Sequence, residues 1–541
     1  MNLLEIKDFS LEIGNTTILN GVNLKLREGQ LHGLIGESGS GKSLTSLSVM
    51  QLLPSGSETS GSIRFDGREI TALGESEMCD LRGNEIGMIF QEPMTALNPL
   101  MSIGDQVAET IRIHTPMSPA EAQAKAAKVL ARVGLPQDKF PMSRFPHELS
   151  GGQRQRVGIA MAVALRPRIL IADEPTTALD VATQAQILDL LKQLVEEEGM
   201  ALLLITHDLA VVADLADEVS IMRHGEVVES GDALPLFTNM QHAYTKQLFS
   251  ASTHVPTRKS VKPSEDGRLL EVAGLVRAYP KARTSLFSKR EVFRAVNGVS
   301  FEIHQGENVG LVGESGCGKS TLARAILGLD RVQGGTIRLK DAEISAEKKI
   351  GHSQRRAMQV VFQDPYGSFN PRHRVSRLVA EPLHVLPDAP IGKERERLVA
   401  DTLEEVGLRA EDTEKYIHEF SGGQRQRIAI ARALIIRPSL IILDEAVSAL
   451  DVSIRAQILD LLADLSDRLT LSYLFISHDL SVVRAVTDRV LVMQQGVIVE
   501  QGNTEELFSA PEHPYTRQLI SAAPDLNLAV ERRQHSELRR N

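Results

Sequence analysis

The segment GESGSGKS at residues 36–43 is the most informative part of the sequence, and it recurs as GESGCGKS at residues 313–320. In such a segment the glycines let successive backbone N–H groups curl around phosphate oxygens, the lysine reaches the β- and γ-phosphates, and the final hydroxyl binds Mg²⁺. Each copy follows an apolar run, LHGLI or NVGLV, and precedes a stretch expected to be helical. The sequence therefore predicts two phosphate loops for a nucleotide. Their binding residues are Gly36, Ser38, Gly39, Gly41, Lys42 and Ser43 in the first loop, and Gly313, Ser315, Gly316, Gly318, Lys319, Ser320 and Thr321 in the second.

Four further kinds of segment recur around the phosphate loops in the same order, so the chain is an internal duplication. The pairs are FQEPMTALNP (90–99) with FQDPYGSFNP (362–371), LSGGQRQR (149–156) with FSGGQRQR (420–427), an apolar run ending in Asp-Glu at 173–174 and again at 444–445, and ITHDL (205–209) with ISHDL (476–480).

The length of 541 residues exceeds what one hydrophobic core usually supports, which favours two domains. Short apolar runs alternate with longer helical stretches, and this pattern predicts an α/β fold with a mainly parallel sheet covered by helices. The polar, proline-containing segment 251–267 reads as an exposed linker. We expect a first domain with a short C-terminal extension at 1–250, a second with the same extension at 268–525, and a polar, frayed tail at 526–541.

The composition excludes several classes of protein. The formal net charge is −10, whereas an extended surface that binds nucleic acid is positively charged, so no nucleic-acid partner is expected. Two cysteines, Cys79 and Cys317, are too few for a disulfide framework or a four-thiolate iron–sulfur cluster, and they suit a reducing compartment. No stretch approaches 18 uncharged apolar residues, so any membrane-spanning helices must come from other subunits.

The Asp-Glu pairs are candidate catalytic groups because each ends an apolar strand downstream of a phosphate loop. Asp173 and Asp444 would hold Mg²⁺, while Glu174 and Glu445 would polarise the attacking water as general bases. Such a pair, taken alone, is more often a solvated loop. The position after a phosphate loop favours the catalytic interpretation.

The SGGQ segments and the strand-end histidines are candidates for contacts to the γ-phosphate. SGGQ opens a helix whose positive end attracts anions, although an ordinary serine cap is the plainer reading of the segment in isolation. His207 and His478 each follow an apolar strand and could donate a hydrogen bond to the same phosphate. A lone strand-end histidine is more often a structural hydrogen-bonding group.

Taken together, these segments resemble the nucleotide-binding domain of ABC ATPases, present twice and covering nearly the whole chain. The resemblance implies that each domain has a mainly parallel sheet, a helical subdomain and an antiparallel β-subdomain, with ATP and Mg²⁺ as cofactors. It also implies a head-to-tail sandwich in which each ATP lies between one half's phosphate loop and the other half's SGGQ, with Asp180 and Asp451 at the seam. One site would combine Lys42, Ser43, Gln91, Asp173, Glu174 and His207 with Ser421, Gly423 and Gln424, and the other would combine Lys319, Ser320, Gln363, Asp444, Glu445 and His478 with Ser150, Gly152 and Gln153. The metal ligands implied are Ser43, Gln91, Asp173, Ser320, Gln363 and Asp444.

A finer resemblance rests on the FQ segments and on the tails QHAYTKQL (241–248) and EHPYTRQL (512–519). These are similar to the ATPase subunits of bacterial dipeptide and oligopeptide importers, and the fusion of two ATPases looks most like the microcin C type. The resemblance implies two transmembrane permease subunits, an extracytoplasmic solute-binding protein, and a peripheral position on the cytoplasmic face of the bacterial inner membrane. Many relatives carry a cysteine-bearing extension for an iron–sulfur cluster, which is missing here, so no cluster is expected.

A second class of protein also fuses two such domains without a membrane span, namely the translation factors that act on the ribosome. Those factors place a long, charged, helical linker between their domains. Three features argue against a function on the ribosome: the short linker, the net negative charge of the chain, and the HPYT-type tails. DNA-repair ABC ATPases fit less well still, because their long coiled-coil or zinc-binding insertions are absent from the sequence.

Three positions depart from the family pattern or are harder to assign. Leu44 stands where relatives commonly carry a hydroxyl, and Ala446 replaces the usual proline after the second Asp-Glu pair. For the aromatic residue that stacks on adenine, the first half offers only Ile13. Tyr279 is the candidate in the second half, with Phe287 and Phe293 as alternatives and a strand-end tyrosine that covers the core as the plainer reading.

Overall fold

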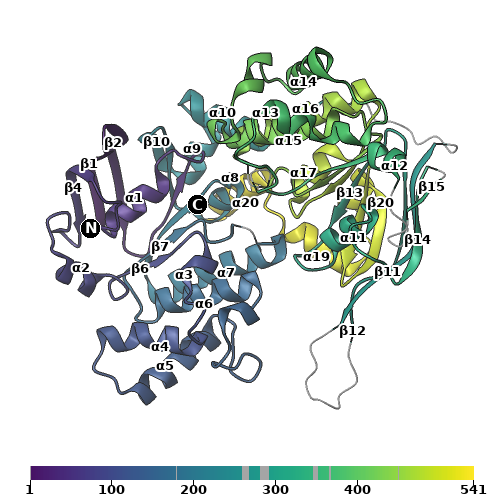
Figure 1. The fold of residues 1–541 in the computed structure, drawn as a ribbon. Coiled ribbons are helices and arrows are strands. Elements are labelled where there is room, and N and C mark those ends of the chain that lie inside the picture. The colour runs from purple at the N-terminus through teal and green to yellow at the C-terminus, as the bar shows by residue number, and fades with distance from the viewer. Residues whose placement is uncertain are drawn as a thin grey trace.

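The computed structural model describes residues 2–177, 179–258, 267–280, 292–340, 342–344, 351–364, 367–448 and 450–540. Residues 259–266 of the expected linker, two residues of the second FQ segment and the alternative adenine residue Phe287 lie outside the described residues. Two similar groups of strands and helices follow one another along the chain, the first purple to blue and the second green to yellow in Figure 1.

Each half contains one antiparallel sheet and one mainly parallel sheet. In the first half the antiparallel sheet has the order β2-β1-β4-β5, and the six-stranded sheet has the order β10-β9-β3-β8-β7-β6 with only β10 antiparallel to its neighbour. The strands are β1 (Asn2–Ile13), β2 (Thr16–Arg27), β3 (Leu31–Ile35), β4 (Ser57–Phe65), β5 (Arg68–Glu69), β6 (Ile86–Ile89), β7 (Ile169–Asp173), β8 (Ala201–Thr206), β9 (Glu218–Arg223) and β10 (Glu226–Asp232).

The second half repeats this arrangement with the orders β12-β11-β14-β15 and β16-β17-β18-β13-β19-β20. Its strands are β11 (Arg268–Pro280), β12 (Val292–His304), β13 (Asn308–Val312), β14 (Gly334–Leu339), β15 (Ala342–Ile344), β16 (Met358–Val361), β17 (Leu440–Asp444), β18 (Ser472–Ile476), β19 (Arg489–Gln494) and β20 (Val497–Asn503).

The helices lie between and around these strands. The first half contains α1 (Lys42–Val49), α2 (Glu75–Leu81), α3 (Pro93–Ala96), α4 (Ile103–His114), α5 (Pro119–Arg132), η1 (Pro146–Glu148), α6 (Gly151–Val163), α7 (Val181–Glu198), α8 (Leu209–Leu215), α9 (Ala233–Thr238) and α10 (Ala243–Ser252). The second contains α11 (Lys319–Ile326), α12 (His352–Ala357), α13 (Val375–Ala380), η2 (Glu381–Val385), α14 (Gly392–Glu405), η3 (Ala410–Glu414), η4 (Ile417–Glu419), α15 (Gly422–Leu434), α16 (Val452–Leu469), α17 (Leu480–Val486), α18 (Thr504–Ser509), α19 (Pro514–Ala522) and α20 (Leu526–Arg540).

The central strands are buried because they read as continuous apolar runs, as expected for parallel strands covered on both faces. β3, β7 and β8 are buried along their whole length, with no alternation of exposed residues. This arrangement confirms the predicted α/β class, in which two similar units each combine a mainly parallel sheet, an antiparallel sheet and helices. The exact domain boundaries stay a prediction.

The C-terminal segment of each half packs against the other half. α10 lies against α16, and beyond it His254 Nε2 lies 2.7 Å from Asp460 Oδ1. In the opposite direction, α20 lies against α8, as Figure 1 shows, and Arg533 Nη2 donates to the backbone oxygen of Asp214 at 3.1 Å. The C-terminal segment of each half therefore also contacts the opposite half.

The expectation of a frayed tail at 526–541 is wrong. Residues Leu526–Arg540 form helix α20, and the side chains of Leu526 and Ala529 are buried in a hydrophobic cluster formed mainly by the first half. The polar composition hides an apolar stripe at 526, 529 and 530, the three- and four-residue spacing of one helix face. This stripe supplies the apolar contact that holds the helix.

Candidate nucleotide sites

The two phosphate loops follow the central strands β3 and β13, each of which lies between two parallel neighbours. Gly41 and Gly318 precede the first helical residues and have φ angles of 103° and 114°. A Cβ at Gly318 would lie 2.1 Å from the backbone oxygen of Ala295, and one at Gly41 would lie 2.5 Å from Leu19 Cδ2. Only glycine fits at these two loop positions, both because of the left-handed backbone and because of the space.

The phosphate-loop lysines are buried cations surrounded by backbone oxygens. Lys42 is only 5% exposed, and its Nζ donates to the oxygens of Gly36 at 2.8 Å and Glu37 at 2.9 Å. Lys319 makes the same pair of bonds, to Gly313 at 2.7 Å and to the following glutamate at 2.9 Å. Burial lowers the pKa of Lys42, while nearby carboxylates, first among them the one at position 174, oppose that change. The loop therefore keeps a positive charge at its centre.

A hydroxyl and a carboxylate meet beside each lysine. Ser43 Oγ donates to Asp173 Oδ1 at 3.1 Å, and Ser320 Oγ donates to Asp444 Oδ1 at 3.4 Å. Burial raises the pKa of both aspartates, and the charge of the neighbouring glutamate contributes in the same direction. A divalent cation would relieve this repulsion, and Mg²⁺ usually takes one or two protein carboxylates together with phosphate oxygens and water. The serine and aspartate pairs fit such an ion.

Glu174 and Glu445 stand directly after β7 and β17 in a left-handed backbone conformation, with φ angles of 47° and 51°. Their N–H groups still donate to the neighbouring strand, to the oxygens of Ile205 and Ile476, both at 2.9 Å. Left-handed backbone costs a non-glycine residue about 1 to 3 kcal/mol and concentrates at functional sites. The sequence gives no sign of this conformation, which recurs in both halves.

The glutamates are held in their ionised form by histidines. His207 Nδ1 lies 3.5 Å from Glu174 Oε1, and His478 Nδ1 lies 3.3 Å from Glu445 Oε1. Burial would raise the pKa of Glu174, but hydrogen bonds from His207 and Thr177 and the nearby positive charges lower it to about 2. The hydrogen bond from His478 is the main cause that lowers the pKa of Glu445. Both carboxylates therefore remain charged at neutral pH, as a general base requires.

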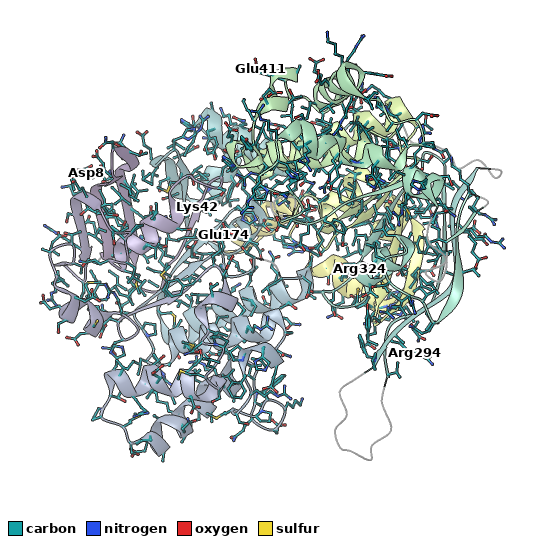
Figure 2. All side chains as sticks on the ribbon, in the orientation of Figure 1. Asp8, Lys42, Glu174, Arg294, Arg324 and Glu411 are labelled. Atoms are coloured by element: carbon teal, nitrogen blue, oxygen red, sulfur yellow. The ribbon has the colours of Figure 1, made fainter. Side chains whose placement is uncertain are left out.

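The two FQ glutamines differ in this structure. Gln91 Nε2 donates to Glu174 Oε2 at 3.0 Å, which joins the FQ segment to the candidate base. Among the hydrogen bonds of the described residues, Gln363 makes no equivalent bond to Glu445. Figure 2 shows Lys42 and Glu174 close together near the junction of the two halves. The first site is therefore the more fully connected of the two.

The SGGQ residues form helix caps. Ser150 Oγ accepts from Gln153 N at 3.3 Å while Gln153 Oε1 accepts from Ser150 N at 2.9 Å, and Ser421 and Gln424 make the same pair of bonds. These bonds are those of an ordinary serine cap, which is the alternative that the sequence left open. A contact between the SGGQ residues and the γ-phosphate stays a prediction. A Cβ at Gly152 would lie 2.3 Å from Thr183 Cγ2, and at Gly423 2.4 Å from Ile454 Cγ2, so both glycines allow close helix packing.

Tyr279 lies near the end of β11, where its ring and hydroxyl both have partners. The Arg277 guanidinium lies 4.1 Å from the ring centroid, and the hydroxyl donates to Asp330 Oδ2 at 3.1 Å. Its stacking on adenine stays a prediction, as does a role for Thr321. Leu44, at the position equivalent to Thr321, packs partly buried against the core of the antiparallel sheet.

Sequence reasoning missed two site residues, Tyr244 in α10 and Tyr515 in α19. Their hydroxyls accept hydrogen bonds from the backbone N–H groups of Glu37 at 3.2 Å and Glu314 at 3.0 Å, in the two phosphate loops. The recurrence of YT in both tails, each after a histidine, was the signal that could have identified them.

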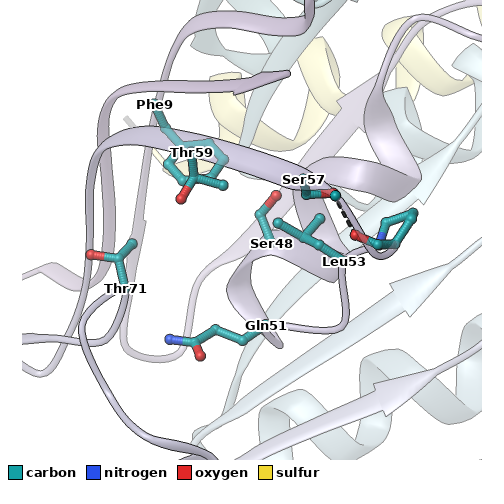
Figure 3. A pocket seen from close by; sticks show the side chains of 9 residues that line it. Phe9, Ser48, Gln51, Leu53, Ser57, Thr59 and Thr71 are labelled. Carbon is teal, nitrogen blue, oxygen red and sulfur yellow. Dashed lines mark hydrogen bonds between the residues drawn. The ribbon is translucent and has the colours of Figure 1, made fainter. Parts of the chain in front are cut away.

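A pocket of about 280 Å³ lies apart from these groups, between α1 and the antiparallel sheet of the first half (Figure 3). Ser48, Gln51, Ser57, Thr59 and Thr71 supply its polar lining. It contains none of the predicted site residues. Within the described residues, no cluster of three or more His, Cys, Asp or Glu side chains could hold a metal ion, and no helix is long and apolar enough to cross a bilayer.

Comparison with known proteins shows where this chain belongs. The model described as "ABC transporter" matches residues 19–177 and 296–448, and the model described as "Oligopeptide/dipeptide transporter, C-terminal region" matches residues 499–540. The chain is 44% identical over 530 residues to the peptidoglycan transport ATP-binding protein YejF of Agrobacterium fabrum, with 96% of each chain covered. It is 46% identical over 544 residues to the glutathione import ATP-binding protein GsiA of Escherichia coli (strain K12), with 94% of this chain and 86% of the relative covered. The GsiA protein of Salmonella typhimurium is 45% identical over 547 residues, with the same coverage. The duplicated phosphate loops, the paired Asp-Glu strand ends and these matches together place the chain in the ABC transporter family, as an ATP-binding protein with two ATPase domains in tandem.

Proposed function

We propose that this protein is the energy-coupling ATPase subunit of a bacterial importer for peptides or peptide-like solutes. The proposed substrate class rests on one observation. Residues 499–540 of the second half match the C-terminal region of oligopeptide and dipeptide transporters. The names of the relatives, a peptidoglycan transport protein and a glutathione import protein, support the same class, because both substrates contain peptide units. The ribosomal alternative has no comparable support.

Each nucleotide site works with MgATP. Lys42 and Lys319 neutralise the phosphates, while Ser43 with Asp173, and Ser320 with Asp444, hold Mg²⁺. Bound Mg²⁺ supplies neutralisation of the charge that develops on the transferred phosphoryl group.

The candidate bases complete the hydrolytic groups. Glu174 and Glu445, kept ionised by the adjacent histidines, accept the proton of the attacking water.

The two halves share their sites. Each phosphate loop faces the SGGQ helix of the other half, with the seam at Asp180 and Asp451. The bond from Ser38 N to Asp451 Oδ1 supports this pairing. Burial raises the pKa of Glu314 in the second phosphate loop, and the charge of Asp180 adds to that change, which supports the same pairing at the second loop. Residues 1–250 and 268–525 form the two domains, and closing of the halves around ATP drives the transport cycle.

The partners are two transmembrane permease subunits and an extracytoplasmic solute-binding protein, with this chain peripheral on the cytoplasmic face of the inner membrane. The Gln91 and Gln363 loops transmit domain closure to the permeases. The bond from Gln91 to Glu174 supports this route, because it joins the loop to the hydrolytic centre of the first site.

The test is to purify the chain from its native membranes in high salt, identify its partners, and measure ATP turnover with the reconstituted permeases and the loaded binding protein. We expect permease subunits to co-purify and peptides to stimulate turnover. Co-purification of ribosomes in place of permeases would refute the transport role. Stimulation by sugars or metal chelates, and not by peptides, would refute the substrate class.

A further inference from the structure

The tails that follow each ATPase domain reach back to its phosphate loop through one buried tyrosine. Tyr244 is 2% exposed and Tyr515 is 5% exposed. Each hydroxyl accepts a hydrogen bond from the glutamate N–H of the loop, Glu37 in the first half at 3.2 Å and Glu314 in the second at 3.0 Å. The same long-range contact therefore occurs in both halves.

Hydrogen bonds within the tail hold this tyrosine in place. In the first half, Glu229 of β10 accepts from the N–H groups of Gln241 at 2.7 Å and His242 at 3.1 Å. The histidine Nδ1 then accepts from Tyr244 N at 3.2 Å and caps α10. These bonds determine where the helix begins, and with it the position of the tyrosine, which is the second residue of α10.

The second half repeats each of these bonds. Glu500 of β20 accepts from Glu512 N at 2.8 Å and from His513 N at 3.0 Å, and His513 Nδ1 accepts from Tyr515 N at 3.2 Å. The transporter C-terminal family model covers only this second tail. The structure thus shows that the first tail, which the model does not match, has the same construction.

The hydroxyl binds the peptide group that also binds the phosphate-loop lysine. The N–H of Glu37 and the oxygen of Gly36 belong to one peptide group, and that oxygen accepts from Lys42 Nζ at 2.8 Å. The tyrosine therefore fixes one end of the peptide plane while the lysine binds the other. Because the hydroxyl occupies the Glu37 N–H, the phosphates are left to the N–H groups of later loop residues.

The hydroxyl stays neutral across the physiological range. Burial is the largest cause that raises the pKa of Tyr244 to about 12, and burial also raises the pKa of Tyr515. A neutral hydroxyl accepts from the loop N–H without placing a negative charge next to the phosphate site. A phenylalanine would fill the same apolar space, so burial of the ring alone does not account for the hydroxyl at both positions.

We propose that Tyr244 and Tyr515 are positioning residues of the two ATP sites: each holds the first peptide group of its phosphate loop, so that the C-terminal tail sets the affinity of the loop for ATP. The proposal rests on ATP binding at these loops. It gives the tail of each domain a function in nucleotide binding, separate from any contact with permeases.

The test uses the full-length protein carrying Glu174→Gln and Glu445→Gln, with MgATP affinity measured by calorimetry. Lys319→Ala or Lys42→Ala is added to leave one functional loop at a time. Loss of one hydrogen bond that pre-organises the loop should weaken ATP binding about 2- to 10-fold. Tyr244→Phe should do so only at the first site and Tyr515→Phe only at the second. In otherwise unmodified protein, each should raise KM for ATP with little change in kcat.

Tyr473→Phe is the matched control. This tyrosine is also buried, and its hydroxyl donates to the backbone oxygen of Leu462 at 3.1 Å, away from both loops. It should cost stability but leave ATP affinity unchanged. Unchanged affinity in folded Tyr244→Phe and Tyr515→Phe, or an equal loss in Tyr473→Phe, would overturn the proposal. Failure of the parent protein to bind ATP at all would instead contradict the proposed function.

Hydrogen exchange of the unmodified protein gives a second measurement that needs no variant to fold. The amides of Glu37 and Glu314 should be protected without nucleotide. Exchange at these two amides as fast as in an unstructured loop would overturn the proposal even if the phenylalanine variants could not be purified.

Discussion

The backbone N–H of Ser38 in the first phosphate loop donates a hydrogen bond to Oδ1 of Asp451, which lies in the other half of the chain. The equivalent residue, Asp180, instead caps its own helix by accepting from Thr183 N at 3.0 Å. Asp451 makes no side-chain cap. The two seam aspartates are therefore used differently, and the first phosphate loop alone is bonded to a carboxylate from the opposite half among the described hydrogen bonds.

Replacing Asp451 with alanine should tighten nucleotide binding at the first site by about 2- to 10-fold. The change removes an anion next to Lys42 and frees the N–H of Ser38 for a phosphate oxygen. Calorimetric titration of MgATP into hydrolysis-deficient protein measures the effect. Asp180→Ala is the control, because it removes a helix cap worth about 1 kcal/mol without freeing a loop N–H. Unchanged or weaker binding after Asp451→Ala would contradict the prediction.

Glu174→Gln and Glu445→Gln should each reduce ATP turnover by about 10²-fold or more, because each removes a general base. Both glutamates are ionised and bonded to a histidine, so neither site has the features of a degenerate one. Steady-state phosphate release measures turnover, with ATP binding as the control for folding. Near-normal turnover in either variant would show that its site does not hydrolyse ATP.

Acid should destabilise the first half through His32. Burial lowers the pKa of this histidine to about 4 from an ordinary value of 6.5. Between these two pH values the histidine is protonated in the unfolded chain and neutral in the folded chain. The contribution of neutral His32 to the free energy of unfolding is complete above about pH 6.5 and is lost as the pH falls toward 4. The free energy of unfolding should therefore fall by about 2 kcal/mol between pH 7 and pH 5.

The second half offers the control substitution, because Val309 occupies the equivalent second position of β13. His32→Val should abolish most of this pH dependence. Hydrogen exchange of β3 against denaturant at pH 7 and pH 5 measures the stability of the first half. If the stability of the first half fell as much between pH 7 and pH 5 in the His32→Val variant as in the unmodified protein, the acid sensitivity would belong to other groups.

Tyr279→Ala should weaken ATP binding at the second site only, if the ring stacks on adenine. Aromatic stacking adds about 0.5 to 1.5 kcal/mol, and the first half has Ile13 at the equivalent place, so the second site should bind ATP about 2- to 10-fold more tightly than the first. Titration with one functional loop at a time separates the sites. Equal affinities before and after the substitution would mean that the ring only covers Arg277 and Asp330.

Leu526→Ala should destabilise the first half, although Leu526 lies at the far end of the sequence. The side chain is 6% exposed and packs in the cluster around α8, and removal of a buried leucine side chain costs about 2 to 5 kcal/mol. Leu528, in the same helix but 47% exposed, is the matched control and should change stability by less than about 0.5 kcal/mol. Hydrogen exchange resolved by segment measures the two halves separately. Destabilisation confined to the second half would contradict the packing of α20.

The sequence predicted the parts of the site whose residues are consecutive. Phosphate loops, strand-end Asp-Glu pairs and strand-end histidines depend on short segments at the ends of apolar strands, and parallel strands bring those ends to one edge of the sheet. Lys42, Asp173, Glu174 and His207 are therefore neighbours in the structure as expected.

Contacts between distant segments could not be predicted in the same way. Tyr244 bonds to a residue more than 200 positions earlier, and nothing in either local segment shows the other partner. The difference between Asp180 and Asp451 arises from the packing of the two halves, since both occupy the same ALD segment. The C-terminal helix was missed because its apolar stripe is narrow and the rest of its surface is polar.

The position of α20 has a consequence for the order in which the protein is made. A ribosome delivers α8 first and Leu526 about 310 residues later, which at 5 to 20 residues per second is a delay of about 15 to 60 s. During that interval the apolar surface of α8 that later receives Leu526 and Ala529 lacks its cover. The first half therefore keeps apolar surface of α8 exposed until residues 526–540 have been made, and its packing is completed by a segment that follows the second half.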